Sequence, residues 1–195
     1  MKGLTVTERM PRLEADPDGR AVEVFPLSTD EAFLHDLLRR LFERHWDKLT
    51  FGPMIQGAAY EFHCPAPPER IALHDGYLTI HVGPSHFHLC IGENLGSSRA
   101  PTPPRLIQRR KPSRAELFRR LGAEATPMSW GFRLFNGAGE PQITLYFPNP
   151  FLSDTDGLLE TPDWSRLALW EECLRLYVGR GPDARDRLGT GFRHD

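Results

Sequence analysis

The stretch RIALHDGYLTIHVGPSHFHLCIGE (70–93) decides the fold, because its alternation of apolar and polar residues predicts two successive β-hairpins. The Asp75-Gly76 pair suits a two-residue type I′ turn, and Gly83-Pro84 provides the second turn. In this register one face carries apolar side chains, namely Ile71, Leu73, Leu78, Ile80, Val82, Phe87, Leu89 and Ile91. The opposite face carries Arg70, His74, Tyr77, Thr79, His81, His86, His88 and Cys90. A slip by one residue would bury polar groups, so the pattern itself predicts that His81 lies opposite His86.

Further strands and helices are predicted on both sides of this stretch. Strands are expected at 21–27, 57–63, 129–135 and 142–148, and residues 92–112 are expected to form a loop. Ser28 and Glu31 have capping-box spacing and predict the start of a first helix. Ser113 and Glu116 have the same spacing and predict a second helix over 114–121, and a third helix should begin near Thr161-Pro162.

The predicted fold class is α+β, with a single antiparallel sheet of about five to six strands and roughly three helices packed on one face. Residues 1–20 are expected to be an irregular leader, 21–180 a single α+β domain, and 181–195 a mobile tail.

Composition argues against several classes of partner. The formal net charge is −2, and the arginine-rich stretch 105–120 is expected to be a solvated edge, so no nucleic-acid partner is predicted. No apolar run approaches the roughly 20 residues needed to cross a bilayer. Three scattered cysteines are too few for a disulfide framework. A soluble protein in the reducing cytoplasm is therefore expected.

The polar face of the hairpins collects residues that bind metals. Five of the eight histidines fall between residues 63 and 88, and His81, His86 and His88 are expected to be neighbours. His63 and Glu61 would join them if the strand 57–63 turned Tyr60 and Phe62 inward, and Cys90 shares the face. Imidazole with carboxylate or thiolate suits a divalent transition metal, with Zn²⁺ or Fe²⁺ favoured. The alternative is a solvated strand face that merely tolerates histidine.

The segment HFHLCIGE (86–93) resembles part of the first cupin motif, in which His-x-His is followed by a glutamate, here His86, His88 and Glu93. The glycine expected upstream and the distal histidine motif have no counterpart in this chain. The resemblance therefore does not assign the family.

Three functions are compatible with the histidine-rich face. The first is metal binding, either without catalysis or in a metalloenzyme in which Arg133 and Tyr146 orient an anionic or oxygen-bearing small molecule. The second is haem or another tetrapyrrole, held by an axial histidine and by Arg133 at the propionates. The third is an interaction domain without a cofactor. The sequence leaves the metal, the reaction and the oligomeric state open.

Overall fold

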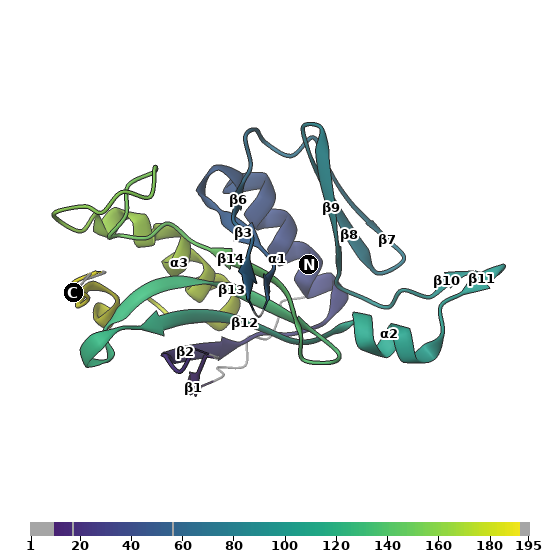
Figure 1. The fold of residues 1–195 in the computed structure, drawn as a ribbon, viewed down its shortest axis with the longest axis horizontal. Coiled ribbons are helices and arrows are strands. Elements are labelled where there is room, and N and C mark those ends of the chain that lie inside the picture. Colours follow the sequence, from purple (N-terminus) through teal and green to yellow (C-terminus); the bar gives the residue numbers. More distant parts are fainter. Residues whose placement is uncertain (1–9, 17, 56, 192–195) are drawn as a thin grey trace. The chain divides into compact units, whose positions relative to one another are not determined.

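The computed structural model describes residues 10–16, 18–55 and 57–191 (Figure 1). The parts of the expected leader and tail at 1–9, 17 and 192–195 lie outside the described residues. The strands are β1 (Arg12–Ala15), β2 (Ala21–Pro26), β3 (Thr50–Gly52), β4 (Met54–Ile55), β5 (Ala58–Ala59), β6 (Phe62–His63), β7 (Arg70–His74), β8 (Tyr77–Val82), β9 (Ser85–Cys90), β10 (Gly96–Ser97), β11 (Ala100–Pro101), β12 (Pro112–Leu121), β13 (Pro127–Asn136) and β14 (Pro141–Tyr146). The α-helices are α1 (Glu31–Arg44), α2 (Pro104–Arg110) and α3 (Ala168–Cys173), and α3 continues into a π-helical turn (Leu174–Val178). Short 3₁₀ turns are Trp46–Lys48, Ala123–Ala125, Trp164–Leu167 and Ala184–Arg187.

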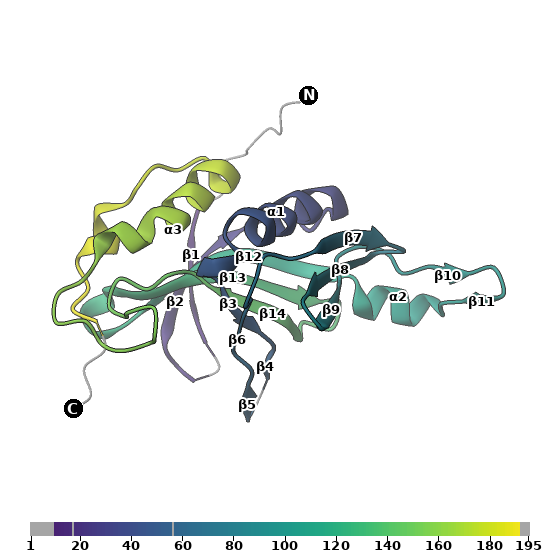
Figure 2. The same ribbon diagram turned by 90° about the horizontal axis from the view of Figure 1, so that it is seen from above.

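The strands form several sheets, so the prediction of a single sheet of five to six strands with helices on one face is wrong. A seven-stranded antiparallel sheet has the order β1-β2-β12-β13-β14-β3-β6. The strands β7-β8-β9 form a separate three-stranded sheet, and β4-β5 and β10-β11 are two-stranded. Figure 2 shows β10 and β11 as a thin ribbon beside α2. None of the helices in the described part of the chain is both long and apolar enough to cross a membrane.

The stretch 114–121 is a strand and not the predicted helix, and this error is one reason why the predicted sheet is wrong. It belongs to β12, which lies between β2 and β13 in the sheet and pairs with β2 from Glu116↔Pro26 to Arg120↔Val22. Both faces of β12 are covered, because consecutive residues 115–119 are all buried. A strand buried on both faces shows no clear alternation, and the Ser113–Glu116 spacing was therefore misleading.

Three other local expectations also differ from the structure. Helix α1 begins after Asp30, whose carboxylate accepts from the N–H groups of Ala32 and Phe33, and Ser28 is not the cap. The expected loop 92–112 contains β10, β11 and α2. The expected strand 57–63 is broken into β5 and β6, and Tyr60 and Phe62 are each 52% exposed instead of facing inward.

The hairpin register predicted from the sequence is confirmed. Strand β7 pairs with β8 from Arg70↔His81 to His74↔Tyr77, and β8 pairs with β9 from Val82↔Ser85 to Tyr77↔Cys90. Asp75 and Gly76 both have positive φ, of 46° and 77°, as a type I′ turn requires. The positions of His81 and His86 as direct cross-strand neighbours follow from this register.

The chain divides into two compact units. The unit that contains the hairpins comprises Ser28–Ala115 and Arg133–Leu145. In its core α1 buries Leu34, Leu37, Leu38, Leu41 and Phe42. The centroid of the Phe42 ring lies 5.1 Å from that of Phe51 and 5.6 Å from that of Phe87, so α1 packs on the apolar face of the hairpin. The other unit comprises the residues up to Leu27, Glu116–Phe132 and the chain from Tyr146 onward.

Candidate functional site

Three imidazoles lie side by side on the polar face of β8 and β9. The ring centroids of His81 and His86 are 5.1 Å apart with the rings stacked, and those of His86 and His88 are 5.0 Å apart with the rings edge to face. His86 and His88 are exposed, and His81 is partly buried. Strand alternation thus brings together the three histidines that the sequence places on one face.

A hydroxyl group positions one of these rings. Thr79 lies opposite His88, and its Oγ1 is 2.7 Å from His88 Nδ1. In the tautomer whose Nδ1–H donates to Thr79, the Nε2 lone pair of His88 remains available to a ligand. Such a contact is typical of the groups that orient metal-binding histidines.

Cys90 shares the face of the histidines but has a different environment. It is only 5% exposed, and its Sγ donates a hydrogen bond to the Gly92 carbonyl at 3.4 Å. Burial raises the pKa of the thiol, partly offset by the Gly92 bond and the Arg110 charge. A thiol that resists ionisation is a poor metal ligand, because the thiolate is the binding form.

The remaining predicted metal ligands lie in a different sheet. His63 belongs to β6, pairs with Thr50 of β3, and has the Thr50 hydroxyl 3.4 Å from each ring nitrogen. Glu61 is exposed and directly precedes β6. Since β6 belongs to the seven-stranded sheet and β9 does not, strand alternation no longer connects either residue with the hairpin histidines.

The two residues expected to bind substrate lie on strands of the seven-stranded sheet. Arg133 lies on β13, with its guanidinium carbon 5.7 Å from the Phe135 ring centroid. Tyr146 ends β14 and belongs to the other compact unit, where its ring packs edge to face on Phe118. Both strands lie in the seven-stranded sheet, so the single-sheet argument that linked them with His88 does not hold.

The spacing of the three imidazoles matches that of rings that share an ion. A ring centroid lies about 3 Å from a metal bound to one of its nitrogens at ~2.1 Å, so two imidazoles in a tetrahedral site have centroids about 5 Å apart. As the side chains stand, the described residues contain no group of three or more His, Cys, Asp or Glu that could hold a metal ion. Binding at this face therefore requires the exposed rings to rotate so that their nitrogens converge.

The hairpin unit also contains a polar pocket that the sequence did not indicate. It has a volume of about 470 Å³. Its lining comes from the start of α1, the end of β9 and the start of β12: Thr29, Glu31, Ile91, Gly92, Glu93, Lys111 and Pro112. Glu93 pairs with Lys111 at 3.3 Å, so the glutamate of the cupin-like segment is engaged in this pocket.

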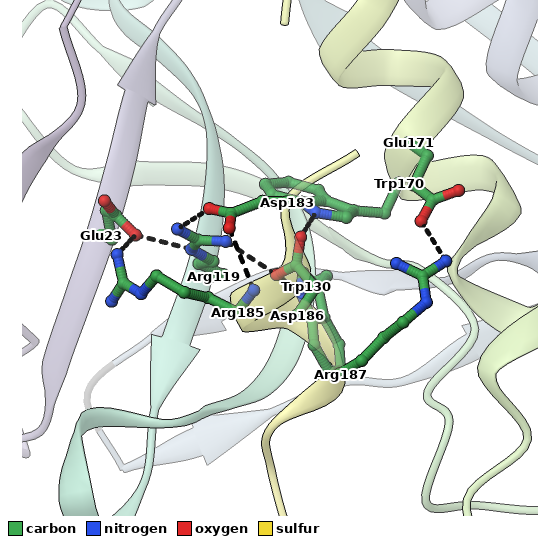
Figure 3. A network of polar contacts seen from close by, with 9 residues as sticks. All are labelled: Glu23, Arg119, Trp130, Trp170, Glu171, Asp183, Arg185, Asp186 and Arg187. Atoms are coloured by element: carbon green, nitrogen blue, oxygen red, sulfur yellow. Dashed lines mark hydrogen bonds and ion pairs between the residues drawn. The ribbon is translucent and has the colours of Figure 1, made fainter. Parts of the chain in front are cut away.

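In the other unit, a buried polar network is the feature that sequence reasoning missed altogether (Figure 3). Arg119 on β12 is 1% exposed and donates to Glu23, Asp183 and Asp186 at 2.6, 2.7 and 2.8 Å. Asp186 is fully buried and also accepts from the indole N–H groups of Trp130 and Trp170 at 2.7 and 2.8 Å.

This network attaches residues 183–186 to the rest of their compact unit. Burial works against the Arg119 charge, but Asp186, Glu23 and Asp183 outweigh it and raise the pKa of the guanidinium. Each of the three guanidinium nitrogens of Arg119 and both indole N–H groups donates to a carboxylate. The residues at 183–186 are thereby held against β12, β13 and α3. One signal was present in the sequence, since a buried tryptophan N–H needs an acceptor.

Comparison with protein families gives one match. A family model described as "Family of unknown function (DUF7676)" matches residues 11–179, so the chain belongs to this family. No curated protein matches the chain.

Proposed function

We propose that this DUF7676 protein binds a divalent transition-metal ion on the polar face of its β8–β9 hairpin, with His86 and His88 as the ligands. Water or His81 fills the remaining positions. The observation that carries the proposal is the spacing of the three imidazoles, whose ring centroids lie 5.0 and 5.1 Å apart. This is the spacing of rings that share one ion.

The metal site uses nitrogen ligands alone. Cys90 is buried and its pKa is raised, so it does not contribute a thiolate. Imidazole ligands suit Zn²⁺, Fe²⁺, Cu²⁺ and Ni²⁺ and discriminate against Mg²⁺ and Ca²⁺, which prefer oxygen. Because His86 and His88 are exposed, the bound ion keeps contact with solvent and exchanges readily.

Isothermal titration calorimetry with Zn²⁺ at neutral pH tests the proposal. The wild-type protein should show saturable uptake, and the His86→Ala/His88→Ala double variant should show none. His74→Ala is the matched control, because His74 is an exposed histidine of the same three-stranded sheet that lies opposite Tyr77 and outside the imidazole stack. This control should bind as the wild type does, and far-UV circular dichroism should be the same for all three proteins.

Two results would overturn the proposal. One is a wild-type protein that takes up neither Zn²⁺ nor Cu²⁺. The other is a double variant that binds as tightly as the wild type, which would mean that the metal site lies elsewhere in the chain.

A further inference from the structure

Within the part of the chain that the structure describes, no strand pairs with the outer edge of β9. Strand β9 is the last strand in the order β7-β8-β9. Ile91 N–H donates to the Gly76 carbonyl, and the register pairs Leu89 with Leu78 and Phe87 with Ile80. Hydrogen-bonded pairs alternate along an antiparallel ladder, so the odd-numbered residues of β9 bond to β8 and the even-numbered residues turn their N–H and C=O outward.

A side-chain contact supports this assignment. The carbonyl of Cys90 accepts a hydrogen bond from Gln142 Nε2 at 3.0 Å, which places an even-numbered carbonyl on the outer edge. The other outward residues of β9 are His86 and His88, the two proposed metal ligands. One short edge therefore combines free backbone groups with two exposed imidazoles.

We propose that a second copy of this chain adds its β9 to this edge, antiparallel, so that His86 of each copy lies opposite His88 of the other. This proposal rests on the proposed metal site and supplies its missing ligands. Four imidazoles, two from each copy, then share one face of the joined sheets and surround a single ion on the two-fold axis at Phe87. The two pairs of opposed residues make four backbone hydrogen bonds.

Of the three registers that place these histidines opposite one another, this one loses the fewest backbone hydrogen bonds. If His86 were opposite its own equivalent, His88 would face Pro84, which has no N–H to donate. If His88 were opposite its own equivalent, His86 would face Cys90, whose carbonyl is engaged by Gln142. Pairing His86 with His88 sets Pro84 of each copy opposite Cys90 of the other, so the missing N–H falls opposite the carbonyl that Gln142 already engages. Opposed residues in such a ladder have Cβ atoms about 5 Å apart.

The ion is the component that makes this contact stable. A contact made by one six-residue strand of each copy buries far less surface than the ~1,200 Å² of a specific protein interface. A metal bound by two histidines from each copy adds a link between the copies. Association should therefore require the metal.

His81 distinguishes the shared site from a site within one chain. Within one chain His81 is the third imidazole of the stack, and its removal should weaken metal binding. In the shared site the four ligands are His86 and His88 of both copies, and His81 lies outside the ligand set.

The test combines molar mass from sedimentation equilibrium with Zn²⁺ stoichiometry from calorimetry. We expect a monomer in chelator and twice that mass with Zn²⁺, at one ion for two chains. His81→Ala should keep both properties, and His86→Ala/His88→Ala should lose both. A monomer that binds one ion per chain, more weakly in His81→Ala, would overturn the shared site and leave the proposed metal function standing. A dimer that persists in chelator would overturn the role of the ion. Absence of uptake would refute the proposed function and this inference together.

Discussion

Replacing Asp186 by alanine tests the buried network of Figure 3 most directly. The carboxylate accepts three hydrogen bonds, two on Oδ1 from Arg119 and Trp130 and one on Oδ2 from Trp170. All three donors lie in the same compact unit, and Asp186 itself is fully buried. Alanine removes every acceptor at once and leaves the donors in place.

The expected loss of stability can be built from these contacts. Two buried indole N–H groups lose their acceptor, and each unsatisfied donor costs about 1–3 kcal/mol. Arg119 keeps Glu23 and Asp183, so its charge remains paired and the larger penalty for an isolated buried charge does not apply. The free energy of unfolding should therefore fall by about 4 kcal/mol. Asparagine, which keeps one oxygen acceptor, should lose less.

Urea unfolding followed by tryptophan fluorescence measures this loss. The matched control is Asp154→Ala, which removes another aspartate paired with an arginine, because Asp154 meets Arg166 at 2.6 Å but its side chain is 91% exposed. An exposed ion pair contributes at most ~1 kcal/mol, so the free energy of unfolding of the control variant should stay close to that of the wild type. If Asp186→Ala lost no more than Asp154→Ala, the segment 183–186 would not be held as the structure shows.

Two further predictions concern a turn and a titration. Gly76→Ala should lower the free energy of unfolding by at least ~1 kcal/mol more than Gly83→Ala does. Both glycines have positive φ, but of the two only Gly76 has backbone close by, since a Cβ there would lie 2.6 Å from the Glu93 carbonyl carbon. Equal losses in urea unfolding would contradict this close approach. For Asp183, burial raises the pKa, but the Arg185 N–H and the Arg119 guanidinium outweigh burial and lower it. Its contribution is therefore complete above about pH 3.9, the unfolded value, and is lost as pH falls through the lower folded pKa. Thermal unfolding of wild type and Asp183→Asn should differ near neutrality and converge in acid, and a constant difference would exclude this linkage.

The hairpin could be predicted from sequence because its determinants are local. The Asp75-Gly76 pair dictates the turn, and the alternation of apolar residues on β8 and β9 fixes which residues share a face. His81, His86 and His88 were therefore brought together correctly. The argument failed where it extended to His63, Arg133 and Tyr146, because parity relates residues only within one sheet, and these lie in another.

Strand β12 shows the opposite situation, in which a local signal was overridden by long-range contacts. The capping-box spacing of Ser113 and Glu116 favours a helix, but Glu116 is itself buried in the sheet. Arg119 can occupy the interior because carboxylates distant in the chain accept from its guanidinium, among them Asp186, 67 residues further along. Helix α2 was missed for a different reason, since Pro104 at its first turn was interpreted as a loop residue although proline is favoured there.

The polar face of the hairpin contains two environments that alternation alone could not separate. His86 and His88 are exposed, whereas Cys90, two residues further along the same face, is covered and hydrogen-bonded. Gln142 closes the edge at Cys90 by bonding to its carbonyl. The face therefore divides into an accessible imidazole end and an inaccessible thiol end. Because the proposed ligands are imidazole nitrogens and Cys90 is not among them, metal binding at the accessible end should be indifferent to the oxidation state of the Cys90 thiol.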